Sequence, residues 1–461
     1  FKSETDYAGK VEFGGLAAGS YEVKIAKEGF YEKTVQVLTE RAQTVEAVLD
    51  HLQELKEVMD VVYSAPAIDP EKTSTTEDLT GQEIVDLPYK TGRDIKNAFP
   101  LMPGIVQDSN GAFHVDGAQT RQTNSQLDGF DITQPETGTI NLHLSADAVR
   151  SISAVTSGYS VEQGKGSGGV IEMNTGMGDN RYRFSATNFI PSAQNKHGVN
   201  LNDWTPRATF SGPIRKDTAW FFDAADGQYK LNIVDSLPRG QDTDPLWEIS
   251  NLAKTQINLT ESNILSGGYL LNRFREEHNG LTRFSPVDTT VDLRQSADMF
   301  YARDLAYLRG GALLESGVAY TRYDNHGVPH GMTPFLITPD GNRGNYFKNF
   351  NDRSSRLQWL TSLVLPGGDW HGRHVFKAGV DFSRVSAAVR NDRRPTFVLR
   401  EDGTLAAETV FVGGSRFSLH NLELNGYGQD RWHISNRLLL EGGIRADHDQ
   451  IIPGVSLSPR V

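Results

Sequence analysis

A glycine cluster followed directly by a short alternating segment sets the strongest limit on how this chain can fold. Gly164, Gly166 and Gly169 have the spacing of a dinucleotide-binding loop, but such a loop needs a helix immediately after its last glycine. The segment that follows, Val170 to Asn174, alternates apolar and polar side chains as a strand does. The glycines therefore predict a turn at which backbones approach closely, not a nucleotide site.

Alternation with a period of two recurs through the second half of the chain. From His374 to Ser383, one face carries Phe376 and Val380 and the other carries polar or small side chains. Leu438 to Asp447 repeats this pattern, and further strands are predicted at 181–189, 219–229, 299–307 and 357–365. The connection at 433–437 is tight and the one at 325–350 is long, which favours antiparallel strands with short turns at one end.

These strands are typical of a transmembrane β-barrel. No run of eighteen apolar residues occurs, which argues against a transmembrane helix. Barrel strands alternate lipid-facing and lumen-facing residues, so a mean hydropathy of -0.44 is compatible with them. We expect about ten to twelve such strands after residue 179.

Composition excludes several classes of function. The 461 residues include 45 glycines and 9% aromatic residues, which suits a β-rich protein with many turns. A net charge of -12 argues against a general nucleic-acid binder, which would show a basic face. The absence of cysteine excludes disulfides, a thiol nucleophile and a cysteine-ligated metal.

No catalytic motif is visible in the sequence, so we expect no enzyme activity and no cofactor. The chain lacks a His-Glu-x-x-His zinc motif, a Gly-x-Ser-x-Gly elbow and a Walker phosphate loop. Two histidine pairs, His326 with His330 and His371 with His374, would bind a metal only if a third ligand converged on them. We expect both pairs to be solvated and predict no metal site.

Five elements in order over about a hundred residues carry a family resemblance. They are Leu87-Pro88, Met102-Pro103-Gly104-Ile105, Leu127-Asp128-Gly129, Gly158-Tyr159-Ser160, and Gly164 with Gly168-Gly169-Val170-Ile171. This series resembles the plug of TonB-dependent outer-membrane receptors. Asp116, Ser153 and Glu172 depart from the pattern of many plugs, and they fit the divergent Oar-like branch better.

The resemblance implies a mainly β fold made of four parts. The first is a partial β-sandwich at 1–50, similar to a carboxypeptidase regulatory-like domain, in which short alternating strands are separated by glycine turns. A linker at 51–80, an α+β plug at 81–178 and the N-terminal part of a large transmembrane antiparallel β-barrel at 179–461 would follow. Family members close with about twice the strands expected here, so we expect a fragment of a longer chain.

The linker contains the segment where this family carries a TonB box. An exposed strand-forming segment on a tether can add itself to the edge of a partner's sheet. The candidate residues are Glu57, Val58, Met59, Asp60, Val61 and Val62, whose valines favour strand formation. An ordinary interdomain linker explains the same residues equally well. The implied partner is the inner-membrane TonB energy-transducing complex.

The resemblance places ligand contacts on the external loops and on the loops of the plug. The plug residues that offer donors and acceptors are His114, Asp116, Arg121, Gln122, Asn124 and Asp128, although the Asp128-Gly129 pair is interpreted first as a structural turn. The implied function is an outer-membrane receptor that binds an external solute, such as an iron chelate, an oligosaccharide or a peptide, and imports it by energy-coupled rearrangement of the plug. The N-terminal domain would lie in the periplasm. The alternative is a surface β-protein that binds carbohydrate or mediates adhesion without transport.

Overall fold

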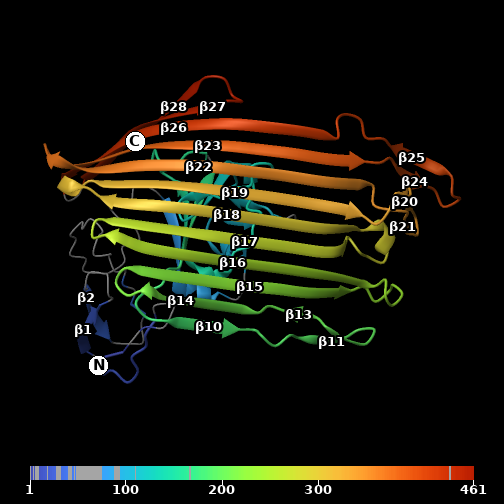
Figure 1. Cartoon of the computed structure of the whole chain (residues 1–461), viewed down its shortest axis with the longest axis horizontal. Helices are drawn as coiled ribbons and strands as arrows, with labels where there is room; N and C mark the ends of the chain where they lie inside the picture. Colours follow the sequence, from blue (N-terminus) through green and yellow to red (C-terminus); the bar gives the residue numbers. More distant parts are fainter. Residues whose placement is uncertain are drawn as a thin grey trace.

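One antiparallel sheet dominates the computed structural model, which describes residues 2–3, 5, 10–17, 19–26, 33–39, 44–45, 47, 75–87, 94–108, 111–165, 168–435 and 438–461. The sheet has 13 strands, and Figure 1 shows the longest of them side by side in chain order. In order they are β10 (Arg183–Thr187), β14 (Arg207–Arg215), β15 (Ala219–Ile233), β16 (Thr243–Thr260), β17 (Asn263–Asn279), β18 (Val291–Tyr307), β19 (Leu313–Pro329), β22 (Lys348–Asp369), β23 (Arg373–Arg393), β26 (Arg416–Ser435), β27 (Leu438–Asp449) and β28 (Val455–Arg460), while β13 (Asp203–Trp204) pairs with β15. We call this the large sheet.

The two ends of the large sheet differ in the length of their connections. At the short-turn end, β16 passes to β17 through residues 261–262 and β22 passes to β23 through residues 370–372. At the opposite, long-loop end, residues 330–347 join β19 to β22 and residues 394–415 join β23 to β26. These long connections carry a small sheet of β20 (Phe335–Thr338), β21 (Gly341–Arg343), β24 (Thr396–Leu399) and β25 (Leu405–Thr409), seen at the right of Figure 1. This alternation of short and long connections is the one that the sequence predicts.

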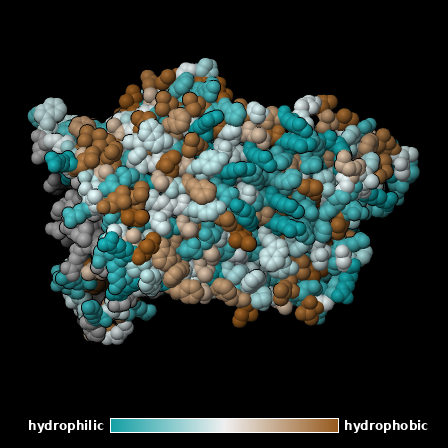
Figure 2. Space-filling model, viewed as in Figure 1, coloured by the Kyte–Doolittle hydropathy of each residue, from teal (hydrophilic) through white to brown (hydrophobic). Residues whose placement is uncertain are grey.

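The outward face of the large sheet carries an apolar band near the short-turn end. Phe376 and Val380 are 45% and 42% exposed, whereas Ser383, on the opposite face of β23, is 2% exposed. Farther toward the long-loop end the outward face becomes charged, where Arg322 and Arg353 both contact Asp324. Figure 2 shows hydrophilic side chains gathered toward that end. From Leu313 to Thr321 the band is about nine residues long, close to the length at which a tilted strand crosses a bilayer.

A smaller unit lies against the inward face of the large sheet and is visible behind its strands in Figure 1. We call residues 75–178 of the described chain the inner unit. Its sheet has the order β3 (Thr75–Thr80), β8 (Val149–Ser157), β9 (Gly169–Thr175), β6 (Thr123–Leu127) and β7 (Phe130–Asp131), and a separate hairpin joins β4 (Ile105–Gln107) to β5 (Phe113–Val115). The helices are α1 (Gly81–Asp86) and the 3-10 helices η1 (Ile95–Leu101), η2 (Thr120–Gln122) and η3 (Ala146–Ala148).

The inner unit and the large sheet share one hydrophobic core. Phe99, Leu127 and Ile152 of the inner unit are fully buried in the same cluster as Phe222 and Met299 of the large sheet. Local signals fix the elements around this core. Thr80 and Glu83 form a reciprocal capping box that starts α1 immediately after β3. Among the described residues, none of the helices combines the length and the apolar character that crossing a membrane requires.

The described part of the N-terminal fifty residues includes one antiparallel hairpin. It pairs β1 (Gly19–Ile25) with β2 (Lys33–Thr39), and Val23 faces Val35 across the pair. Figure 1 places this hairpin at the short-turn end of the large sheet. The predicted mainly β architecture is therefore confirmed. The predicted domain boundaries remain predictions, although β3 extends the sheet of the inner unit to Thr75, six residues before the predicted start at 81.

We expect a lysine at Val318 to lower the free energy of unfolding from a lipid bilayer by about 2 to 4 kcal/mol. Val318 lies in the apolar band and points outward, so Val318→Lys would expose an ammonium group to hydrocarbon. Val328 is the matched control, because it lies on the same face of β19 but beyond the charged residues Arg322 and Asp324. Val328→Lys should cost about 1 kcal/mol or less. Denaturant titration in lipid vesicles measures both values, and equal costs at the two positions would contradict the assignment of the band.

Candidate functional site

The turn at Asp128 and Gly129 ties the inner unit to the wall of the large sheet. Asp128 has a φ of 48° and is 7% exposed. Its carboxylate accepts hydrogen bonds from the Thr175 backbone N–H (2.9 Å) and the Thr175 hydroxyl (2.7 Å) within the inner unit. From the large sheet it accepts bonds from Lys254 Nζ (2.9 Å) and from the Tyr301 hydroxyl (2.6 Å). Burial raises the pKa of Asp128, but Lys254, Tyr301 and Thr175 together outweigh burial and hold that pKa below its usual value.

A second connection lies three residues farther along, where Asp131 forms an ion pair with Arg356 of β22. Both side chains are less than 10% exposed. The Asp131 backbone N–H donates to the Gln358 side chain at 3.0 Å, and the Tyr323 hydroxyl donates to the Ile132 carbonyl at 2.6 Å. The segment 131–132, at the end of β7, therefore docks on the neighbouring strands β19 and β22 through both a side-chain charge and backbone groups.

His143 forms a third connection, with three carboxylates around one imidazole. Its Nε2 lies 2.5 Å from Asp226 Oδ2 of β15, and its Nδ1 lies 3.3 Å from Asp94 Oδ2 and 3.4 Å from Glu248 Oε2. The Asn272 side chain bonds both the N–H and the carbonyl of His143, at 2.8 Å each. Burial lowers the pKa of His143, but Asp94 and Asp226 outweigh it and hold that pKa well above 6.5. His143 is therefore an imidazolium that links the inner unit to the wall.

The glycine cluster meets the last strands of the large sheet. Arg445 of β27, 2% exposed, donates to the carbonyls of Val161 (3.3 Å) and Glu162 (3.0 Å). Arg460 of β28 donates to the carbonyls of Ser160 (2.5 Å) and Gln163 (2.9 Å), among others. A Cβ atom on Gly164 would overlap the Arg445 guanidinium. A side chain at 164 would displace this guanidinium, so glycine allows the charged group to pack directly against the backbone.

The structure places His114 and Asp116 on the β4–β5 hairpin, away from these connections. His114 lies 2.8 Å from the Ala118 carbonyl and 3.4 Å from Asp108 Oδ2. The hydrogen bond to Ala118, followed by the one to Asp108, raises the pKa of His114. Asp116 is exposed in a turn with a φ of 47°. Both side chains are accessible, and their predicted contact with a solute remains a prediction.

Arg121, Gln122 and Asn124 differ in their surroundings. Arg121 and Gln122 lie in η2 and are exposed, and Gln122 Oε1 accepts from the Gln119 backbone N–H at 2.8 Å. Asn124 is buried in β6 and contacts the Gly164 carbonyl at 3.5 Å and the Thr133 hydroxyl at 3.4 Å. Of the three, Arg121 and Gln122 have the exposure that a solute contact requires. The candidate TonB box, 57–62, lies outside the described residues.

A cavity of about 370 Å³ opens in the inner unit beside η2. Thr123 and Ser125 line it from one face of β6, whereas Asn124, on the other face, does not. The remaining wall mixes charged, polar and apolar residues, which are Asp94, Lys96, Asn97, Gln107, Gly111, Ala112, Phe113, Thr120, Gly138, Thr139, Ile140 and Ile171. Its polar lining offers hydrogen bonds to a small solute, and its apolar part offers packing.

Sequence reasoning missed the residues of the large sheet that hold the inner unit. Lys254 and Arg356 contact residues 126 and 225 positions earlier in the chain, and His143 was not singled out at all. The alternation in the predicted strands indicates which charged side chains face inward, and an inward charge that is buried needs a partner. The alternation does not indicate which residue of the inner unit that partner is.

We expect Asp128→Asn to open the sheet of the inner unit. An amide cannot neutralise Lys254, whose buried charge would be left unpaired at a cost of about 3 to 5 kcal/mol. Hydrogen exchange of the β9 amides measures the change in local opening free energy. Asp116→Asn is the matched control, because Asp116 also precedes a glycine in a positive-φ turn but is exposed, and its effect should stay within about 0.5 kcal/mol. Equal protection of β9 in the two variants would contradict the role assigned to Asp128.

Because its carboxylate neighbours raise the pKa of His143, we expect the contribution of His143 to the free energy of unfolding to fall as the pH rises. A histidine whose folded pKa is raised contributes stability fully below the unfolded value of about 6.5, and that contribution is lost as the pH passes through the folded pKa. His143→Gln should lower the urea midpoint of the inner unit at pH 6 and flatten the decline on the alkaline side. The exposed His420 of β26 supplies the control variant His420→Gln, which should keep the wild-type slope. A His143→Gln variant with the wild-type slope would overturn the assignment.

Comparisons with known proteins were made in sequence and in structure. No family model matches the chain. Over 245 residues the chain is 28% identical to the TonB-dependent transporter Oar from Myxococcus xanthus, an alignment that covers 47% of this chain and 23% of Oar. The chain thus spans less than a quarter of the length of this relative.

Solved structures share the fold at low sequence identity. The outer-membrane transporter YddB from Escherichia coli superposes with a TM-score of 0.64 at 15% identity, covering 84% of this chain and 58% of YddB. The siderophore receptor PirA from Acinetobacter baumannii gives 0.61 at 14% identity, with 83% and 58% covered. The alcaligin outer-membrane receptor FauA from Bordetella pertussis gives 0.59 at 12% identity, with 85% and 59% covered.

These relatives are transporters and receptors rather than enzymes, in agreement with the sequence prediction. The predicted outer-membrane location agrees with them as well. The superpositions with these structures cover more than four fifths of this chain. The chain therefore has the fold of the TonB-dependent outer-membrane receptors and is similar in sequence to their Oar branch.

Proposed function

We propose that the whole protein is a receptor that binds an external solute and imports it when the TonB complex drives a rearrangement of the inner unit. The inner unit corresponds to a plug domain at 81–178, and the large sheet to the wall of a barrel that begins at 179. The observation that carries the proposal is the position of the inner unit, which lies on the inward face of the wall and is held there by buried charge. A solute that passes along this face requires the inner unit to move.

The energetics of the connections explain why work is needed. Removing one partner from a buried ion pair costs about 3 to 5 kcal/mol. The pairs of Asp128 with Lys254, Asp131 with Arg356 and His143 with Asp226 are all buried. A movement that separates these pairs while their charges stay buried would meet this cost at each pair, which is why an external force is proposed. A protein of the outer membrane obtains such a force from a mechanical partner.

The connection to that partner is proposed through the chain before β3. β3 is an edge strand of the inner unit, and within the described residues it pairs with β8 alone. β3 forms the last six residues of the predicted linker at 51–80, which also includes the candidate TonB box. A pull on the chain before β3 would load β3 first and then α1, which begins at the next residue. β3 is thus the element through which force would enter the inner unit.

Solute binding is proposed at the cavity of the inner unit and at the exposed residues of η2. Arg121 and Gln122 supply donors beside Thr120 and Thr123, which line the cavity. This mixture of donors, acceptors and apolar surface suits a small polar solute, a description that fits an iron chelate, an oligosaccharide fragment or a short peptide. PirA and FauA are described as siderophore and alcaligin receptors, which makes an iron chelate the first class to test.

Val61→Pro tests the energy coupling. Proline removes a backbone N–H and cannot join a sheet edge, so the variant should lose binding to the purified periplasmic domain of TonB. Binding is measured with the detergent-solubilised full-length protein, by the change in Kd relative to wild type, and we expect at least a tenfold loss. The fold of the variant is checked by its heat-modifiable mobility, which should not change.

Thr73→Pro is the matched control, because it introduces the same residue into the same linker outside the candidate box. It should bind the TonB domain as the wild type does. Equal binding by Val61→Pro and wild type would refute the assignment of 57–62. Equal losses in the two proline variants would show that the whole linker, rather than this segment, makes the contact.

A further inference from the structure

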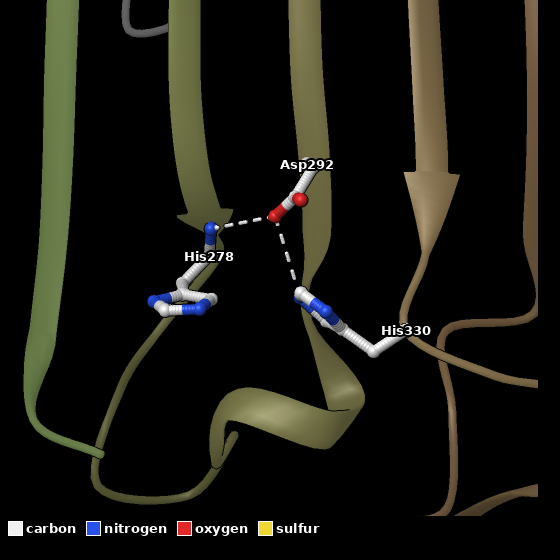
Figure 3. A group of neighbouring side chains, drawn as sticks. All are labelled: His278, Asp292 and His330. Carbon is white, nitrogen blue, oxygen red and sulfur yellow. Dashed lines mark hydrogen bonds and ion pairs between the residues drawn. The ribbon is translucent and has the colours of Figure 1, made fainter. Parts of the chain in front are cut away.

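Three potential metal ligands converge at the long-loop end of the large sheet. His278 is the penultimate residue of β17, Asp292 is the second residue of β18, and His330 follows the last residue of β19. Figure 3 shows the Asp292 carboxylate between the two histidines, which it approaches from the neighbouring strand. Antiparallel pairing explains the convergence, because the end of one strand lies beside the beginning of the next. The three residues are separated by up to 52 positions in the sequence, yet they form one cluster in space.

The distances within this cluster are short. One ligand atom from each residue lies within 4.8 Å of the other two. His330 Nε2 is 3.4 Å from Asp292 Oδ1, and the His278 backbone N–H donates to the same oxygen at 3.3 Å. The two imidazole rings are 5.3 Å apart between centroids. All three side chains are accessible in part, so an ion from solution can reach them.

His278 is held in the orientation that a ligand requires. Its backbone has a φ of 59°, at an irregularity where the pairing of β17 with β18 shifts between Glu276 and Asn279. Its Nδ1 lies 2.7 Å from the Thr243 carbonyl. An N–H at Nδ1 that donates to this carbonyl leaves Nε2 as a free lone pair. A backbone carbonyl that fixes the tautomer in this way is typical of metal-binding histidines.

The chemistry of the three ligands selects a class of ion. Two imidazoles and one carboxylate suit Zn²⁺ and neighbouring transition metals, whereas Mg²⁺ and Ca²⁺ prefer oxygen ligands alone. Bonds of about 2.0 to 2.2 Å to a tetrahedral Zn²⁺ place the ligand atoms closer together than 4.8 Å, so the site must contract. His330 can supply that movement because it stands in a loop beyond the end of β19. Three protein ligands leave one position for water.

Acidic groups lie near the cluster. Asp244 interacts electrostatically with His278 and with Glu276, and Lys230 also interacts with Asp244. The Thr290 hydroxyl, 3.1 Å from His330 Nε2, adds a further oxygen at the site.

We propose that His278, Asp292 and His330 bind one divalent transition-metal ion, with Zn²⁺ as the reference ion, at the long-loop end of the large sheet. The bound ion would link the ends of three strands and the connections that follow them. Those connections already touch, since Asn345 Nδ2 donates to the Asp288 carbonyl and Asn342 Nδ2 donates to Ser285 Oγ. The ion would therefore order the loops over the large sheet. This role is independent of solute import and of TonB.

The test is Zn²⁺ binding to the purified full-length protein in detergent, measured by competition with a chromophoric chelator. Wild-type protein should bind one Zn²⁺ per chain at this site. Asp292→Asn keeps an oxygen that accepts from the His278 N–H but removes the charge. His278→Asn removes the imidazole but introduces a residue that also tolerates the positive φ at this position. Each variant, and His330→Gln, should weaken binding by at least about 100-fold.

His326→Gln is the matched control, because His326 lies in β19 only four residues before His330 and is not a member of the cluster. It should bind Zn²⁺ as the wild type does. Co²⁺ provides a second readout, since its visible absorption reports coordination by nitrogen and should vanish in His278→Asn and His330→Gln. Wild-type protein that binds no Zn²⁺ at about 10 μM, or variants that bind as tightly as wild type, would overturn the proposal.

Discussion

Buried charge between the inner unit and the large sheet is the constraint on which the structure depends. A charged group removed from water is costly unless an opposite charge and further hydrogen bonds meet it. Asp128, Asp131 and His143 of the inner unit each find such partners on a different part of the wall. Because each pair works in only one relative placement, the pairs determine how the inner unit sits. Apolar packing around Phe222 and Met299 adds stability, but because it is non-directional it does little to fix the orientation of the inner unit.

The same contacts require the sheet to curve. Partners of the inner unit come from successive strands, from Arg207 of β14 to Arg460 of β28. Eleven strands spaced about 4.8 Å apart span roughly 48 Å when flat, whereas a compact unit of about 100 residues, with a radius of gyration of about 13 Å, is only about 34 Å across. A flat sheet would therefore leave its outer strands out of reach. The large sheet therefore curves because polar side chains on its inward face, from successive strands, all contact the same inner unit.

Much of the fold could be predicted because its signals are local. The alternation around Phe376 and Val380 depends only on neighbouring residues, and the structure bears it out. The close approach predicted at Gly164 is found, although the neighbour is the Arg445 side chain rather than a second backbone. The connections to the wall could not be predicted, since Asp128 and Lys254 are 126 positions apart. The cluster of His278, Asp292 and His330 could not be predicted either, because it depends on the pairing of β17, β18 and β19.

The alternation of faces also limits how the chain can change in length. Side chains repeat every two residues along a strand, so one inserted residue reverses every position beyond it. Consider β22 with its pairing held at the long-loop end. One residue inserted after Trp359 would leave Arg356 in place, whereas one inserted between Lys348 and Arg356 would turn the Arg356 guanidinium toward lipid. Insertions in the 330–347 and 394–415 connections shift no strand of the large sheet. New recognition surfaces can therefore arise by lengthening the loops, while the number of residues in each strand stays fixed.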